Sequence, residues 1–336
     1  MSIAPYIKEI GRGKDGARPL NAEQAEDLLS QVLDGQVTDL EIGAFCLAMR
    51  IKGEAVPELD GFVRATLARS LPVHEAAEAL AANASARPIK GMVVLPSYNG
   101  ARKLPNLTAL LAALLAREGV AVLVHGPERD PTRVTTAQVF DALGWPAART
   151  VADLTGQWLA GQPAFMPIAS LCPGLARLLD VRWTVGLRNP AHTVAKLLDP
   201  FAGAGCGAPR PTALPSLRVV NHTHPEYAHS LTAYLQHAAA DALLMRGTEG
   251  EPVADARRQP RFDAFVQGIK HAALSRAQVD GVLTALPALP EDARADTTAA
   301  WIRRVLAGDV PTPDAILGQR DCLLAMLALL AERTPT

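Results

Sequence analysis

Aromatic residues are scarce in this chain of 336 residues, where Phe, Trp and Tyr together make up 4% of the sequence. Stacking on aromatic rings therefore cannot dominate its surface. Long apolar runs are also missing, since residues 323–330 are too few to cross a bilayer and are typical of a core helix. No apolar segment of the signal-peptide type follows the N-terminus. We therefore expect no membrane partner and a cytoplasmic location.

Cysteine is equally rare, with four residues in the whole chain and no Cys-x-x-Cys spacing. Such isolated cysteines fit neither a zinc site nor a disulfide framework, and they suit a reducing compartment. His222, His224 and His229 lie close together, but in a loop that enters a helix and without a neighbouring cysteine. Capping or surface roles are favoured over metal binding there, so we predict no metal and no cofactor.

An excess of charge of one sign is lacking too, because the net charge is −1. This excludes a uniformly basic nucleic-acid binder, but the charges are unevenly distributed. Residues 87–133 contain seven Lys and Arg against three acids, residues 177–218 contain six against two, and residues 1–70 contain eight against eleven. The middle of the chain is therefore locally basic and the N-terminal segment acidic.

The chain changes its pattern after an N-terminal helical segment. Residues 1–70 show helical spacing, with helices expected from a cap at Asn21 to residue 33, over 39–51 and from Pro57 to residue 67. From residue 89 short apolar runs alternate with helices, as in a parallel α/β sheet. The expected strands are 92–95, 120–124, 164–167, 217–220 and 242–245, and residues from 296 to the end predict two terminal helices.

The segment from Leu95 to Lys103 lies between the first expected strand and a helix. Such loops hold phosphates in α/β proteins, because unpaired N–H groups at the helix start point into them. This loop has unusual content for that task. Pro96 lacks an N–H, Tyr98 is bulky, and two cations follow at Arg102 and Lys103. We interpret it as a phosphate loop rebuilt for a different ligand.

The helical segment contains the loop 33–39 and ends in Arg50-Ile51-Lys52-Gly53-Glu54. In these residues it resembles the N-terminal domain of anthranilate phosphoribosyltransferases, and the order of elements is similar over nearly the whole chain. The resemblance implies the fold of the glycosyltransferase family 3 and nucleoside phosphorylase group, an α/β class. It places a small all-helical domain at 1–75, with a contribution from about 177–200, and a larger parallel or mixed-sheet domain at 76–336. It also implies a homodimer formed through the helical domain.

The catalytic motifs of those transferases are not retained. Their glycine-rich diphosphate loop is replaced by residues 96–101, their Lys-His-Gly-Asn motif by residues 124–127, and their magnesium-binding acids by Pro252 and Val253. Nearby acids at Glu249 and Glu251 either substitute for that pair or shape their own loop, and we favour shaping. What remains is a vestigial phosphate site made of Ser97, Asn99, Gly100, Asn106, Thr108, His125 and Gly126.

The departures resemble instead the YbiB-type proteins, which are similar to the transferases. The matching segments are 7–14, 96–103, 125–134, 224–227 and 246–252. This resemblance implies a homodimer that binds DNA and RNA without sequence preference and lacks the transferase activity. The candidate contact residues are Lys8, Arg12, Lys14, Tyr98, Arg102, Lys103, Arg129, Arg133, Arg182, Arg188, Lys196, Arg257 and Arg258.

Each of these residues also has a simpler interpretation. Isolated cations are commonly solvated, Tyr98 is either a base-stacking platform or a packed loop residue, and Arg182 and Arg188 either bind a ligand or pack between the domains. Two other functions compete with nucleic-acid binding. One is a phosphoribosyltransferase or nucleoside phosphorylase with an altered substrate, and the other is a scaffold that binds another protein.

Overall fold

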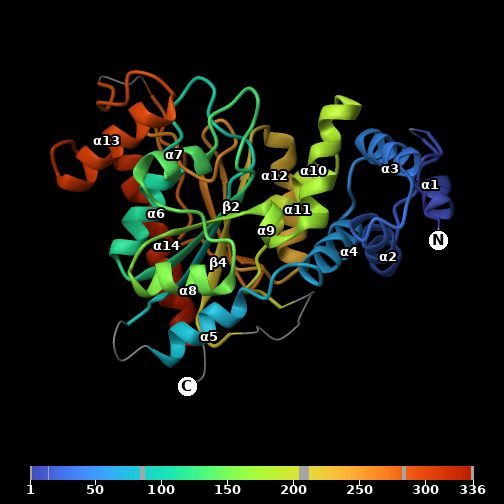
Figure 1. Ribbon diagram of the computed structural model, residues 1–336, viewed down its shortest axis with the longest axis horizontal. Coiled ribbons are helices and arrows are strands. Elements are labelled where there is room, and N and C mark those ends of the chain that lie inside the picture. The colour runs from blue at the N-terminus through green and yellow to red at the C-terminus, as the bar shows by residue number, and fades with distance from the viewer. Residues whose placement is uncertain (1, 14, 84–87, 204–211, 282–284, 334–336) are drawn as a thin grey trace.

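The computed structural model describes residues 2–13, 15–83, 88–203, 212–281 and 285–333. Four N-terminal helices gather at one end of the molecule (Figure 1). Side chains of Asn21 and Thr38 cap two of them, each with a capping box, which is why these helices begin where the sequence predicts. The four helices are α1 (Ala4–Ile10), α2 (Ala22–Leu33), α3 (Asp39–Lys52) and α4 (Val56–Leu67).

One mixed sheet forms the centre of the larger part, in the order β3-β2-β1-β4-β5-β6-β7. The first five strands are parallel and contain the five predicted segments. They are β1 (Gly91–Pro96), β2 (Val120–Gly126), β3 (Ala164–Pro167), β4 (Ser216–His222) and β5 (Ala242–Arg246). The antiparallel β6 (Phe262–Val266) and β7 (Ile269–Lys270) were not predicted, because Asp263 interrupts an already short apolar run.

Helices cover the sheet on both faces (Figure 1). The expected fold class, a small helical domain followed by a larger mixed α/β domain, is confirmed. Among the described residues, no helix combines the length and the apolar character needed to cross a bilayer. The remaining helices are α5 (His74–Ala82), α6 (Thr108–Arg117), α7 (Thr136–Leu143), α8 (Val151–Leu159), α9 (Ile168–Leu171), α10 (Pro173–Val185), α11 (Ala191–Leu197), α12 (Pro225–His237), α13 (Ala295–Ala307) and α14 (Asp314–Arg333).

Alternation along the strands divides the apolar core into two. Met92 and Val94 of β1 join the core that continues into the helical domain, whereas Val93 and Leu95 join the core beneath α6, α13 and α14. Successive side chains of a strand point to opposite faces. A fully buried apolar strand is therefore what a sheet covered on both faces requires.

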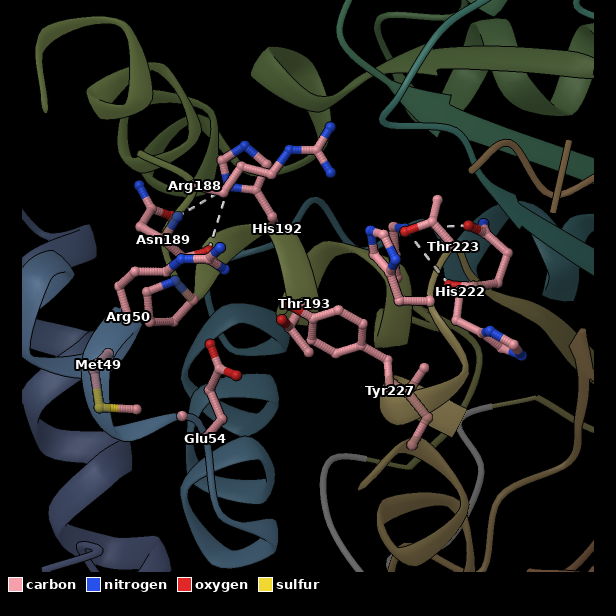
Figure 2. Close-up of a pocket in the computed structure, with 16 residues that line it drawn as sticks. Met49, Arg50, Glu54, Arg188, Asn189, His192, Thr193, His222, Thr223 and Tyr227 are labelled. Carbon is pink, nitrogen blue, oxygen red and sulfur yellow. Dashed lines mark hydrogen bonds between the residues drawn. The ribbon is translucent and has the colours of Figure 1, made fainter. Parts of the chain in front are cut away.

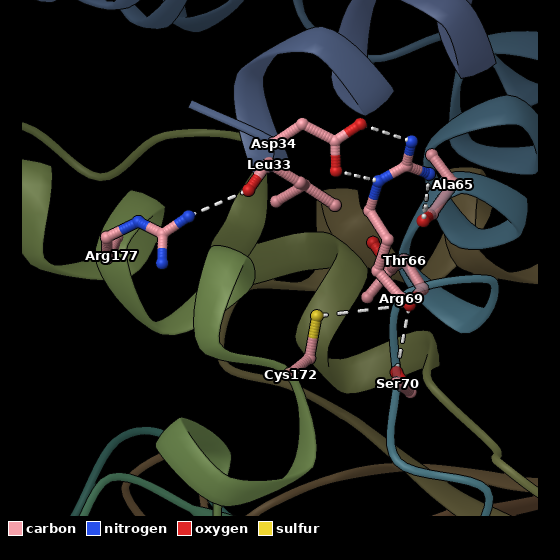
Figure 3. Close-up of polar contacts among 8 residues, drawn as sticks. All are labelled: Leu33, Asp34, Ala65, Thr66, Arg69, Ser70, Cys172 and Arg177. Carbon is pink, nitrogen blue, oxygen red and sulfur yellow. Dashed lines mark hydrogen bonds and ion pairs between the residues drawn. The ribbon is translucent and has the colours of Figure 1, made fainter. Parts of the chain in front are cut away.

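Polar contacts fasten α9 and α10 to the helical bundle (Figure 3). Arg69 forms a bidentate ion pair with Asp34 at 2.6 and 2.7 Å, and Arg177 donates to the carbonyl oxygen of Leu33 at 2.8 Å. The backbone N–H of Leu71 donates to the carbonyl oxygen of Leu171. These contacts fix where α10, and the loop that follows it, lie relative to the bundle.

Close packing of α2 against α4 depends on Gly61, because a Cβ there would lie 2.2 Å from the carbonyl oxygen of Ala22. We expect Gly61→Ala to lower the free energy of unfolding by about 1–3 kcal/mol through overpacking, measured by urea titration. Gly156→Ala in α8 is the matched control, since no atom lies within 4 Å of its Cβ position. The control should be neutral or slightly stabilising, and equal effects of both changes would contradict the packing argument.

Candidate functional site

The loop after β1 is closed by a carboxylate from the loop after β5. Glu251 is buried, and its Oε1 accepts hydrogen bonds from the backbone N–H groups of Asn99 at 2.8 Å and Gly100 at 2.7 Å. Its Oε2 accepts from the side chains of Ser97, Asn106 and Thr136. N–H groups in such a loop are those that hold a phosphate in other α/β proteins. Here an internal carboxylate takes the place of that anion.

A second carboxylate binds three further N–H groups of the same loop, beyond Ala101. Glu249 accepts hydrogen bonds from Arg102 at 2.7 Å, Lys103 at 2.9 Å and Leu104 at 3.2 Å. Burial raises the pKa of the Glu249 carboxyl, but these backbone donors outweigh burial and hold it below its ordinary value. The close approach requires a glycine at 250, because a Cβ there would lie 1.5 Å from Asn99 Nδ2.

Sheet order explains why these loops meet. β4 separates β5 from β1, and Gly247, at the end of β5, has backbone so close to Glu251 that no side chain fits between them. The loop therefore turns back across the end of β4 towards β1. On the other side Ala101 and Val134 exchange two backbone hydrogen bonds, which ties the loop after β2 to the same place.

Tyr98 does not face solvent, which corrects the expectation that it stacks on an unpaired base. Its side chain is 4% exposed, and its hydroxyl lies 2.7 Å from Nδ1 of His125. Burial lowers the pKa of His125 to about 3, so this imidazole is neutral. A ring enclosed in this way has no free face for a base. The structure therefore supports the simpler interpretation of Tyr98 as a packed loop residue.

The other members of the vestigial phosphate site surround the same carboxylate. Asn106 donates to Thr136 and, through its Oδ1, accepts from the N–H of Thr108. Gly126, at the end of β2, approaches the carbonyl oxygen of Ser97 so closely that a Cβ would lie 1.9 Å from it. Ser97, Asn99, Gly100 and Asn106 are thus engaged with Glu251, whereas Thr108 Oγ1 and His125 Nε2 are buried without a hydrogen-bond partner among the described residues.

A group of cations lies beside this closed site. Burial, followed by the charges of Arg182 and Arg133, lowers the pKa of the Arg188 guanidinium, so the three arginines are near neighbours. Asp130 pairs with Arg182 at 3.1 Å. Lys196 donates to the Asn221 side chain at 3.1 Å. We call Arg133, Arg182, Arg188 and Lys196 the cation cluster.

A cleft of about 280 Å³ opens between the helical domain and the loops around α11 and α12 (Figure 2). Arg50 and Glu54 reach it from the end of α3, opposite Arg188, His192 and Tyr227 (Figure 2). The full lining is Met49, Arg50, Gly53, Glu54, Arg188, Asn189, Pro190, His192, Thr193, Lys196, Asn221, His222, Thr223, His224, Tyr227 and Leu231.

Titration in the cleft reflects burial and the excess of positive charge. Burial, and then Arg188, lower the pKa of Lys196 to about 8. Burial together with Arg188 and Arg182 lowers the pKa of His192 to about 3. Burial raises the pKa of Glu54. Arg50, Arg188 and Lys196 line the cleft against the one carboxylate of Glu54, so its described lining has more cations than anions.

The remaining predicted cations lie in several places. Arg102, Lys103 and Arg129 are exposed at the strand-end loops. Arg257 pairs with Asp255 at 2.7 Å and Arg258 donates to the carbonyl oxygen of Gly281. Lys8 and Arg12 belong to the region of α1, where Arg12 pairs with Glu9, and no contact joins them to the cation cluster. Lys14 lies outside the described residues.

Several residues of this region were not among the candidates from sequence. Arg50 belongs to the Arg-Ile-Lys-Gly-Glu motif, which is the signal that identifies it. The binding role of Glu251 towards the loop after β1 has no local signal, since its partners are about 150 residues away in the chain. In the described part of the chain no group of three or more His, Cys, Asp or Glu side chains is arranged to hold a metal.

Comparisons with known proteins place the chain among transferase-like proteins. Residues 4–70 match the glycosyl transferase family helical bundle domain. The chain is 37% identical over 324 residues to the uncharacterized protein YbiB of Escherichia coli. The alignment covers 96% of this chain and 94% of YbiB. It is 26% identical over 304 residues to anthranilate phosphoribosyltransferase 2 of Ralstonia nicotianae, covering 89% of this chain and 80% of that one.

Solved structures share the fold at low identity. The Saccharomyces cerevisiae anthranilate phosphoribosyltransferase in complex with PRPP and Mg aligns with a TM-score of 0.67 at 12% identity, covering 98% of this chain and 90% of the enzyme. The Thermus thermophilus enzyme aligns with a TM-score of 0.62 at 20% identity, and the alignment covers 98% of this chain and 97% of the enzyme. These likenesses concern the architecture alone.

Removing the charge of Glu251 tests its role in closing the loop. We expect Glu251→Gln to lower the free energy of unfolding by about 2–3 kcal/mol, because an amide group would face N–H donors in a buried site. Urea titration measures this. Glu118→Gln is the control, because Glu118 makes only a surface ion pair with Lys90 at 3.5 Å and should change stability by less than about 0.5 kcal/mol. An equally small effect at Glu251 would contradict the assignment.

Proposed function

Because the chain belongs to the family of Escherichia coli YbiB, on the fold of the anthranilate phosphoribosyltransferases, we propose that it is a homodimer that binds DNA and RNA without sequence preference. The observation that carries this proposal is the cation cluster. Arg188 and Lys196 line the cleft, the charges of Arg182 and Arg133 act on Arg188, and the carboxylate of Asp130 pairs with Arg182. Mutual repulsion among buried like charges is relieved when an anion binds, and a polyanion releases counterions as it does so.

Exposed cations continue beyond the cleft, which favours a polymer over a small anion. Arg129 lines a neighbouring cavity together with Arg182, while Arg102 and Lys103 project from the loop whose backbone is held by Glu249. Contacts of this kind reach phosphates, which every sequence presents alike, and carry no base-specific information. Arg257, Arg258, Lys8, Arg12 and Lys14 remain proposed outer contacts.

The homodimer is proposed through the helical domain, which we place at residues 1–75. On α3 an exposed apolar stripe runs along one side, with Leu40 84% exposed, Leu47 47% and Ile51 61%. Apolar side chains repeated at this spacing on a surface helix are typical of a protein interface. A second copy would cover them and would present two clefts to one nucleic-acid chain, which increases avidity.

The alternative, a phosphoribosyltransferase or nucleoside phosphorylase, is supported by the fold and by Asn106, Thr108 and His125. It requires N–H groups free to bind a diphosphate and carboxylates free to bind magnesium. Glu251 and Glu249 already accept hydrogen bonds from those N–H groups, so neither requirement is met by these residues. We therefore rank this function second and propose no catalytic residues.

Neutralising two members of the cation cluster should weaken binding to every sequence alike. For the double variant Arg188→Gln with Lys196→Gln, the slope of log K against log salt concentration should become shallower by about 1.5, since each phosphate contact contributes about 0.7–0.9. Fluorescence anisotropy with unrelated DNA and RNA sequences over a salt series measures this slope. Lys90→Gln is the control, because Lys90 immediately precedes β1 and so lies at the end of the parallel strands opposite to the loop after β1.

An unchanged slope in the double variant would remove the cleft from the binding site. Calorimetry with phosphoribosyl pyrophosphate and magnesium tests the alternative function. Magnesium-dependent binding of phosphoribosyl pyrophosphate would place the transferase or phosphorylase function above nucleic-acid binding. Sedimentation of the free protein shows whether it is a dimer.

The lowered pKa of Lys196 predicts a pH dependence. Its cation is present below about pH 8 and is lost as the pH rises through that value. Nucleic-acid affinity should therefore fall between pH 7 and pH 9, and binding near pH 8 should be accompanied by proton uptake, because a bound phosphate favours the charged lysine. Anisotropy titrations at fixed ionic strength measure the affinity. In Lys196→Gln the fall should disappear, and persistence of the fall there would assign it to another group.

A further inference from the structure

Two exposed aromatic side chains lie beside the cation cluster. Tyr227 is 37% exposed and Trp183 is 49% exposed. Tyr227 projects into the cleft towards Thr193 and Glu54 (Figure 2). Trp183 carries the Arg182 guanidinium at 4.0 Å from the centre of its ring. In a chain with few aromatic residues, this placement of two exposed rings next to several cations suggests a role beyond packing.

Both rings are partly exposed and neither is stacked on another ring of the described residues. His224 lies 6.3 Å from the Tyr227 ring and is tilted by 50° to it. The Arg182 guanidinium lies over the Trp183 ring, about half of whose residue surface is exposed. A nucleic-acid base stacks on an exposed aromatic ring whatever its identity, because every base has a π surface.

The two aromatic residues line adjoining cavities. Trp183 lines a second cavity, of about 170 Å³, together with Arg129, Asp130 and Arg182. His192 lines both this cavity and the cleft that contains Tyr227 and Arg188. We call these two adjoining cavities the groove, and each of them combines an aromatic ring with a guanidinium group.

We propose that this groove binds single-stranded nucleic acid in preference to duplex, with unpaired bases on Tyr227 and Trp183 and the intervening phosphates on Arg188 and Arg182. The inference rests on the proposed nucleic-acid binding and specifies the class of ligand. Bases within a duplex are stacked on each other and present no free face, so a duplex reaches the cations but not the rings. A cleft of about 280 Å³ admits a nucleotide-sized group and excludes a double helix.

Ring removal separates the two kinds of ligand. Tyr227→Ala should weaken binding of a single-stranded oligonucleotide roughly tenfold, the usual effect of losing one base stack, and should change duplex affinity by less than about twofold. Trp183→Ala should act in the same direction. The salt dependence should be unchanged in both variants, because no phosphate contact is lost. Anisotropy with matched single-stranded and duplex DNA measures all of these quantities.

Tyr227→Phe retains the ring and should bind like the parent protein, while Ile269→Ala removes an exposed apolar side chain, 72% exposed, from the distant strand β7. A second readout is direct. An oligonucleotide containing 2-aminopurine should change its fluorescence on binding to the parent protein and to Tyr227→Phe, and less so with Tyr227→Ala.

The outcomes distinguish this inference from the function on which it rests. If the parent protein binds neither strand form, the proposed function fails. If it binds both forms equally, or if Tyr227→Ala weakens both equally, nucleic-acid binding stands and the single-strand preference is overturned. If Trp183→Ala instead dissociates a dimer in sedimentation, Trp183 is an interface residue and its part in the proposal is overturned.

Discussion

The carboxylate of Glu251 is the contact on which the rest of this region depends. It joins the loop after β5 to the loop after β1 by accepting hydrogen bonds from two backbone N–H groups and from the side chains around them. A buried carboxylate is stable only when its oxygens are fully hydrogen-bonded, and here they are. Because Glu249 accepts from the N–H groups of Arg102, Lys103 and Leu104 in the same way, two carboxylates of the chain itself hold the loop on either side of Ala101.

In the described part of the chain, this arrangement leaves neighbouring cations without close ion pairs to Glu249 and Glu251. The two carboxylates are engaged with N–H groups, so they do not form close ion pairs with the arginines nearby. Arg188 and Lys196 are left at the cleft with lowered pKa values, partly because they repel one another and their neighbours. A near-neutral chain thus has a cleft whose described lining contains more cations than carboxylates. The proposed polyanion binding therefore rests on the position of the charges and not on their total.

The cleft also depends on the helical domain lying where it does. Arg50 and Glu54 come from the end of α3, whereas Arg188 and Tyr227 come from segments more than 130 residues later in the chain. The hydrogen bonds of Arg177 in α10 with Leu33, and of Leu71 with Leu171 in α9, hold these two parts together. A site between two domains uses side chains that neither domain could assemble alone.

The sequence by itself determined the elements and the family. Capping residues such as Asn21 and Thr38, apolar runs such as 92–95, and the Arg50–Glu54 motif act locally, and local patterns are what a sequence shows directly. Only the tertiary structure decided which residues face the cleft. Tyr98 follows β1 and Tyr227 lies in the first turn of α12, yet packing against His125 buries the first and the second lines the cleft. Glu251 and its partners are about 150 residues apart, and the order of strands in the sheet, which no local pattern specifies, brings them together.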